Sequence, residues 1–247
     1  MRVAVISDVH ANLEALKRVL QFIDNHPVDA LWCLGDVVGY GPEPEACVGI
    51  LRERATIVLA GNHDLAVVDK IPLDAFNPVA REAILWQRQR LSQASKTWLA
   101  TLSPRIDLSE ITLAHGSPRS PIWEYVDRPD IALDNYDAFD SSVCLIGHSH
   151  LALAWRLLQS QGERKAILET MAPGESLALG EQDKWLLNPG SVGQPRDHDP
   201  RASFAILDWE GRVWTWYRLT YDIESVESAI IQAGLPTMLG RRLFLGW

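Results

Sequence analysis

The chain has 247 residues, enough for a large domain with an ample core, and a formal net charge of −9. This acidic balance argues against binding to a nucleic-acid backbone, which needs a basic stripe. No apolar run approaches membrane-spanning length, and no signal-peptide pattern follows Met1, so we expect no membrane contact. Three cysteines at no metal-binding spacing are typical of a reducing compartment, and we expect a cytoplasmic protein.

The first third of the chain alternates between strand and helix patterns. The expected elements are a strand at 3–6, a helix at 12–25, a strand at 29–34, a helix from Pro44 and a strand at 56–60. Asn12 is the expected N-cap of the first helix. This alternation predicts a parallel sheet with helices on its faces.

The middle of the chain is less regular. Residues 80–102 have a helical but imperfect apolar stripe, which predicts a break near Ser92. Apolar runs at 111–114 and 143–146 predict two further strands. The aromatic and acidic segment 117–140 between them has no clear periodicity, and we expect a loop that overhangs the site.

From Leu151 onward, short strand-like runs are separated by turns. These runs cover residues 151–158, 166–170, 184–187, 202–208 and 213–219. They predict antiparallel strands of a second sheet that packs on the first. A final helix is expected between Asp222 as its cap and Gly234 as its stop. No linker composition divides the chain, so we expect a single domain, 1–247.

Each of five apolar runs ends abruptly in Asp, Asn or His. The polar residues after these runs are Asp8 and His10; Asp36; Asn62, His63 and Asp64; His115; and His148 and His150. Five of the seven histidines are in this set, far more than isolated structural histidines would give. Polar side chains that follow buried strands predict a site at the carboxyl edge of the sheet.

These blocks resemble a known family in their order and rough spacing. Asp8-x-His10, Gly35-Asp36, Gly61-Asn62-His63-Asp64, His115 and Gly147-His148-x-His150 are similar to the five blocks of the calcineurin-like metallophosphoesterases. A later block, Asn188-Pro189-Gly190-Ser191, resembles the small prokaryotic branch. The resemblance implies an α/β fold of four layers, α/β/β/α, with two mixed β-sheets packed face to face and helices outside.

The donor types favour two transition-metal ions. Carboxylate oxygens with imidazole nitrogens suit manganese, our first expectation, and also iron, zinc, cobalt or nickel, whereas calcium and magnesium are disfavoured. Two carboxylates, one amide and four imidazoles are too many for a single ion. The resemblance implies a bridging Asp36, one shell completed by Asp8, His10 and His150, and a second completed by Asn62, His115 and His148.

Two adjacent ions can bind the oxygens of a phosphoester and lower the pKa of a bound water, so that hydroxide attacks phosphorus. His63 is left over from the ligand count and resembles the general acid of the family. Asp64 either holds the His63 ring or caps a helix after the turn. We therefore expect catalytic roles for His63 and Asp64, and a small phosphoester, including a nucleotide, as substrate.

Several interpretations stay open. Tyr40 either lines the pocket or packs within its own loop. Segment 188–197 either brings Arg196 to a phosphate or only crosses between the sheets. His198 lies either at the rim of the site or in a polar loop. Val37-Val38-Gly39-Tyr40 follows Asp36 where protein phosphatases of the superfamily carry an arginine, which argues against that activity.

We expect a phosphodiesterase first and a phosphomonoesterase second. A dinucleoside polyphosphate hydrolase fits the same chemistry, although no sequence feature of its own marks it. A non-catalytic interaction scaffold on the same fold is the alternative from a different class, and the complete set of blocks argues against it. The sequence defines neither the natural substrate nor an oligomeric state.

Overall fold

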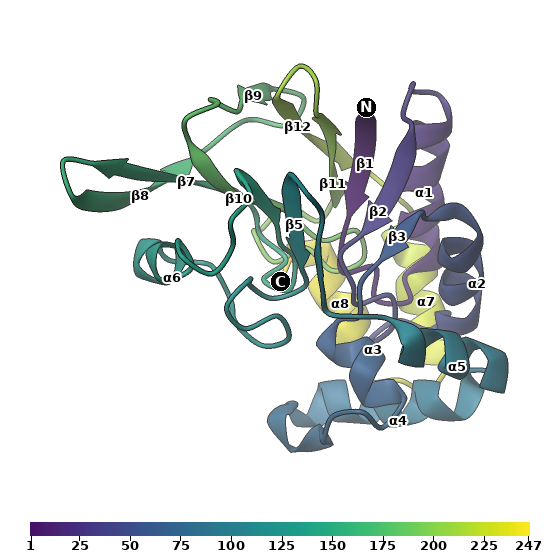
Figure 1. The fold of residues 1–247 in the computed structure, drawn as a ribbon. Coiled ribbons are helices and arrows are strands. Elements are labelled where there is room, and N and C mark those ends of the chain that lie inside the picture. The colour runs from purple at the N-terminus through teal and green to yellow at the C-terminus, as the bar shows by residue number, and fades with distance from the viewer.

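The computed structural model describes residues 1–247, which form two six-stranded β-sheets (Figure 1). The first sheet has the order β3-β2-β1-β11-β12-β9. Its strands are β1 (Arg2–Ile6), β2 (Ala30–Cys33), β3 (Ile57–Val58), β9 (Ser176–Ala178), β11 (Ala202–Asp208) and β12 (Val213–Leu219). The second has the order β4-β5-β6-β10-β7-β8. Its strands are β4 (Arg105–Asp107), β5 (Ile111–Ala114), β6 (Val143–Leu145), β7 (Ala152–Ser160), β8 (Glu163–Glu169) and β10 (Lys184–Pro189).

Most helices cover the outer face of the first sheet, and only one short α-helix lies against the second (Figure 1). The α-helices are α1 (Leu13–Asp24), α2 (Pro44–Arg54), α3 (Asn62–Val67), α4 (Pro78–Arg90), α5 (Gln93–Thr101), α6 (Pro129–Asp134), α7 (Ile223–Gln232) and α8 (Met238–Arg241). Two 3₁₀ helices are η1 (Leu73–Ala75) and η2 (Arg242–Leu245). The expected α/β sandwich of two mixed sheets is confirmed, with a thin outer layer on the second sheet.

Each sheet contains three parallel strands. In the first sheet β1 pairs in parallel with β2, and β2 with β3. In the second sheet β5 pairs in parallel with β6, and β6 with β10. The other pairings are antiparallel. The motif residues follow the carboxyl ends of these parallel strands, so parallel pairing brings them to common edges.

The sheet membership expected for the later strands is partly wrong. β7, β8 and β10 do lie in the second sheet, but β11 and β12 belong to the first, where β11 pairs with β1 (Val3 opposite Leu207). The strand that precedes His115 and the strand that precedes His148 belong to the second sheet. An apolar pattern shows which residues are buried but not which neighbouring edge supplies their hydrogen bonds, and β11 covers the edge of β1 that β2 leaves free.

Local signals placed the helix ends correctly. The Oδ1 atom of Asn12 accepts the N–H of Ala15 at 3.1 Å, and α1 starts at the next residue after this N-cap. The helix expected at 80–102 is broken, as expected, at Ser92, which caps α5. Asp222 caps α7 through the N–H of Ser225 at 2.9 Å. The strands β4 and β9 and the helices α6 and α8 were not expected, because each has only three to six residues; α6 lies inside the segment 117–140, where a loop was expected.

Alternate residues of the first sheet enter two different cores. Ala4 and Ile6 pack towards the helices, whereas Val3 and Val5 pack towards the second sheet. This period of two is what a strand buried on both faces requires. The three cysteines are buried and unpaired. None of the helices is both long enough and apolar enough to cross the bilayer.

Two tryptophans of β12 provide a matched test of the core between the sheets. Trp214 and Trp216 are both buried, but the indole N–H of Trp216 donates to the carbonyl of Asn188 at 2.9 Å, whereas that of Trp214 has no partner. We expect Trp216→Phe to lower the free energy of unfolding by about 1–3 kcal/mol more than Trp214→Phe, because it removes a buried hydrogen bond. Urea unfolding of both variants measures the difference; equal losses would contradict this account.

Candidate metal centre

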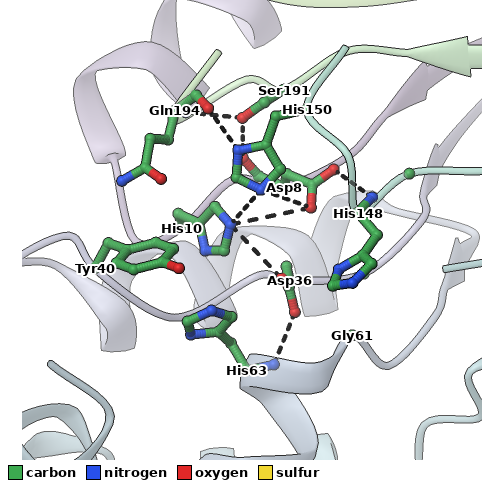
Figure 2. A network of polar contacts seen from close by, with 12 residues as sticks. Asp8, His10, Asp36, Tyr40, Gly61, His63, His148, His150, Ser191 and Gln194 are labelled. Atoms are coloured by element: carbon green, nitrogen blue, oxygen red, sulfur yellow. Dashed lines mark hydrogen bonds and ion pairs between the residues drawn. The ribbon is translucent and has the colours of Figure 1, made fainter. Parts of the chain in front are cut away.

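Buried carboxylates and imidazoles gather in two groups that share one residue. Figure 2 shows the whole first group and, from the second, Asp36 and His148. The first group contains Asp8, His10, Asp36 and His150; the second contains Asp36, His115 and His148. Within each group the candidate ligand atoms all lie within 4.8 Å of one another. Asn62 joins the second group, since its Oδ1 atom lies 3.3 Å from Nε2 of His115. The structure thus brings together all seven residues expected to bind metal.

Backbone carbonyls fix the orientation of three imidazoles. The Nδ1 atoms of His10, His115 and His150 lie 2.9, 2.8 and 2.5 Å from the carbonyl oxygens of Val38, Leu34 and Gln194. A carbonyl only accepts hydrogen bonds, so each Nδ1 carries the proton and each Nε2 presents a lone pair.

Ring nitrogens of neighbouring imidazoles face one another. Nε2 of His10 lies 3.0 Å from Nε2 of His150, and Nε2 of His115 lies 3.2 Å from Nδ1 of His148. In the first pair both Nε2 atoms present lone pairs, which repel at this distance unless a cation lies between them. Ligands about 2.1 Å from one ion lie roughly 3.0–3.4 Å apart, so the observed separations fit metal coordination.

Asp36 lies between the two groups. Its Oδ2 atom is 3.6 Å from Nε2 of His10 and 3.6 Å from Nε2 of His115. Its Oδ1 atom accepts the backbone N–H of His63 at 2.9 Å. The close approach of the Asp36 carboxylate to the backbone of residue 61 requires glycine there, because a Cβ atom at Gly61 would lie 2.0 Å from Oδ1 of Asp36. The carboxylate is therefore placed where one residue can serve both groups.

Asp8 has a buried oxygen with no donor. Its Oδ2 atom accepts the backbone N–H of His148 at 3.1 Å, but its Oδ1 atom makes no hydrogen bond and lies 3.3 Å from Nε2 of His150. An unpaired buried carboxylate oxygen is unfavourable unless a cation binds it. This orphaned atom is a second indication that the residues fit a metal ion.

The backbone at the site is strained. Residues with left-handed φ angles between 49° and 63° include five of the expected ligands: Asp8, His10, Asp36, His148 and His150. Non-glycine residues adopt this conformation at a free-energy cost, and such residues cluster at functional sites. The strain indicates that these positions serve ligand geometry rather than regular structure.

Burial keeps the imidazoles neutral. Loss of hydration lowers the pKa of His150 to about 4, and lowers those of His10 and His148 well below their ordinary value. A neutral imidazole offers its lone pair to a metal without first losing a proton. Burial, together with the charges of Asp64 and Asp8, raises the pKa of Asp36, and a divalent cation acts in the opposite direction.

A family model described as the calcineurin-like phosphoesterase superfamily domain matches residues 1–212. The chain belongs to this superfamily. Membership and the buried cluster of histidines and carboxylates together make it a metal-dependent phosphoesterase, an enzyme that hydrolyses phosphoric esters.

Relatives cover the whole chain. An uncharacterised protein of Methanocaldococcus jannaschii is 37% identical over 99% of this chain and 98% of its own length. The crystal structure of a metallophosphoesterase from Sphaerobacter thermophilus has a TM-score of 0.88 and 42% identity, over 100% of this chain and 99% of that one. A symmetrical bis(5'-nucleosyl)-tetraphosphatase of Glaesserella parasuis is 30% identical, but over only 50% of this chain and 47% of its own length.

The side chains of the two residues expected to be catalytic in this phosphoesterase have different surroundings. His63 lies at the pocket, where its Nδ1 atom is buried without a hydrogen-bond partner. The carboxylate of Asp64 does not bond to that ring; it accepts the backbone N–H groups of Gly61, Val37 and Val38. Of the two roles left open for Asp64, its contacts match helix capping.

The pocket beside the two groups encloses about 160 Å³ and includes residues that the motifs did not identify. Tyr40 lines it, as one of the two interpretations expected, and its ring lies beside those of His10 and His63 (Figure 2). Phe76, Trp123 and Tyr125 form another part of its wall. For Trp123 and Tyr125, the aromatic composition of segment 117–140 was the one signal that the sequence offered.

Two arginines lie near Tyr40. The guanidinium carbons of Arg196 and Arg242 are each 5.9 Å from the ring centroid of Tyr40. The Nε atom of Arg242 donates to the main-chain oxygen of the C-terminal Trp247, whereas Arg196 bonds only to Gln194 and Tyr40. Arg196 lines the pocket and its Nε atom is buried without a partner. His198 is exposed and accepts the indole N–H of Trp247 at 2.9 Å, away from the pocket wall. Nothing in the sequence pointed to Arg242.

The shared position of Asp36 gives a test of the site. We expect Asp36→Asn to lose activity and to bind much less metal than the wild type, because one carboxylate contributes to both groups. Inductively coupled plasma mass spectrometry of the purified variants measures the occupancy. Asp24→Asn, on the exposed surface of α1, is the control and should keep full occupancy. Undiminished occupancy in Asp36→Asn would mean that Asp36 does not bridge.

Proposed function

We propose that the protein hydrolyses phosphodiesters at a pair of divalent ions, with phosphomonoesters as a second substrate class. The observation that carries this proposal is the convergence of imidazole nitrogens, 3.0 and 3.2 Å apart, around a shared Asp36. The first ion would be held by Asp8, His10, Asp36 and His150, and the second by Asp36, Asn62, His115 and His148. Manganese is the metal we expect first, with iron, zinc, cobalt or nickel as alternatives.

The remaining residues would orient the ester and its leaving group. When bound, two such ions supply Lewis acidity and lower the pKa of water towards neutrality. Arg196 is the candidate for binding a phosphoryl oxygen, since its charge is unpaired and it lines the pocket. Tyr40 packs against both His10 and His63 and restrains their rings.

His63 is the candidate proton donor to the leaving group. Burial, and then the charge of Arg196, lowers the pKa of His63 well below its ordinary value, so the free ring is neutral at pH 7. An anionic phosphoester bound beside it acts in the opposite sense and favours the protonated ring. Asp64 would support this role indirectly, because it holds the backbone of Val37, Val38 and Gly61 around Asp36 and His63.

Tetraphosphatase relatives support a nucleotide substrate, and dinucleoside polyphosphate hydrolysis is the alternative reaction at the same centre. The non-catalytic scaffold is disfavoured, because no ligand block is missing from the buried groups. We further propose that residues 1–247 work as one domain, and that the free buried cysteines reflect a cytoplasmic location.

The first functional prediction concerns metal dependence. We expect bis(p-nitrophenyl) phosphate to be hydrolysed in the presence of Mn²⁺, and we expect EDTA to abolish the activity until Mn²⁺ is restored. Release of p-nitrophenolate at 405 nm, roughly its absorbance maximum, is the measurement. If no phosphoester in a panel of mono-, di- and dinucleoside esters is hydrolysed with Mn, Co, Ni, Zn or Fe, the scaffold interpretation becomes the better one.

The second functional prediction separates an acid from a ligand. His63→Gln should keep both ions but lose leaving-group protonation, worth roughly 10²–10⁴-fold in rate. The loss should be large for alkyl or ribose leaving groups and small for p-nitrophenolate, which departs without a proton. His10→Gln, in contrast, should lose metal and should lose activity on every ester. Equal losses across leaving groups in His63→Gln, together with loss of one metal equivalent, would identify His63 as a ligand.

A further inference from the structure

One wall of the pocket is aromatic. Phe76 precedes α4, whereas Trp123 and Tyr125 come from the segment between β5 and α6. Phe76 is 7% exposed, but Trp123 is 38% and Tyr125 is 43% exposed. Large aromatic side chains left exposed inside a polar pocket are typical of a ligand-binding surface. We call Phe76, Trp123 and Tyr125 the aromatic wall.

Ring contacts connect the aromatic wall to the metal centre. The ring of Tyr125 stacks on His148, with 4.3 Å between centroids and 5° between planes. Trp123 packs edge-to-face on Phe76 at 5.2 Å, and Phe76 packs in the same way on His63 at 5.1 Å. The wall therefore contacts the proposed metal ligand His148 through Tyr125 and the proposed acid His63 through Phe76, and Trp123 continues it along the pocket.

Residues outside the pocket lining hold the aromatic wall in place. Glu124, between the two exposed aromatics, accepts hydrogen bonds from Ser117 Oγ at 2.6 Å and from Asn135 Nδ2 at 2.8 Å. Arg119 forms an ion pair with the same carboxylate. The indole N–H of Trp155 donates to the carbonyl of Val126 at 3.0 Å. A wall anchored in this way loses little conformational entropy when a ligand binds.

We propose that the aromatic wall binds a planar aromatic group of the substrate, of the size and chemistry of a nucleobase, while the phosphoryl group lies at the metal centre. Flat rings stack on tryptophan and tyrosine with little dependence on the identity of the base. Asn77 lines the same pocket, and its Oδ1 atom is used by the N–H of Ala80, which leaves its NH₂ group as a donor to the edge of such a ring. This inference rests on the proposed function.

The first experiment compares two diesters with the same leaving group. Bis(p-nitrophenyl) phosphate and methyl p-nitrophenyl phosphate both release p-nitrophenolate, but only the first keeps an aromatic group on phosphorus. Their intrinsic reactivities differ, so the quantity of interest is the ratio of their kcat/KM values in each variant. We expect Trp123→Ala to lower this ratio roughly 5- to 100-fold, and Trp123→Phe to retain most of it.

Trp209→Ala is the control for the loss of a tryptophan side chain elsewhere in the protein. The backbone N–H of Trp209 donates to Met1 at the opposite end of β1 from Asp8, so Trp209→Ala should leave the ratio unchanged. Circular dichroism and metal content should also be unchanged in Trp123→Ala, because Trp123 is exposed and contacts no proposed ligand directly. An unchanged ratio in Trp123→Ala would overturn the proposal.

The second experiment measures binding without turnover. Isothermal titration calorimetry of the manganese-loaded protein compares the phosphonate analogues of adenosine 5'-monophosphate and ribose 5-phosphate, which carry a carbon–phosphorus bond in place of the hydrolysable ester bond. The two analogues differ in that a hydroxyl group replaces the base. We expect the wild type to bind the nucleotide analogue more tightly and Trp123→Ala to bind both similarly. Equal dissociation constants in the wild type would overturn the aromatic wall and leave the proposed hydrolysis intact. Tighter binding of the nucleotide analogue without hydrolysis of any ester would support the wall and contradict the proposed function.

Discussion

The structure depends on one electrostatic constraint: carboxylate oxygens and imidazole lone pairs converge at the bottom of a pocket, almost fully buried by the chain. His10 and His150 point their Nε2 atoms at each other at 3.0 Å, and Oδ1 of Asp8 has no donor. Such a cluster is unfavourable in isolation and becomes favourable when cations occupy its centre. Carbonyls of the chain orient three of the four imidazole rings without the ions. The protein is therefore arranged to bind metal before it binds substrate.

The two sheets explain how residues so far apart in the chain share this space. Asp8 and Asp36 follow parallel strands of the first sheet, and His115 and His148 follow parallel strands of the second. The sequence predicted these residues as a site because an apolar run that stops in polar side chains marks a strand end. It did not predict that the two halves of the site come from different sheets, since burial patterns are the same whichever edge a strand joins.

The parts of the site that sequence did not predict are those fixed by tertiary contacts. Asp64 follows His63 directly, yet helix geometry turns its carboxylate to the N–H groups of Gly61 and Val37. The direction of Trp123 and Tyr125 depends on Glu124, whose partners lie up to 11 residues away. Neither arrangement has a periodicity or a local motif. Motif spacing reports which residues follow strands, whereas side-chain direction depends on packing.

The charge around the site has to be considered separately from the net charge of the whole chain. A net charge of −9 disfavours polyanions in general, and Asp8 and Asp36 alone would repel a phosphoester. Arg196 adds one positive charge near Tyr40 whose hydrogen-bond partners, Gln194 and Tyr40, are neutral. Two divalent ions would add four more and reverse the sign of the local field. Metal loading and anion binding are then coupled, because the carboxylates that attract the ions also exclude the substrate until the ions are in place.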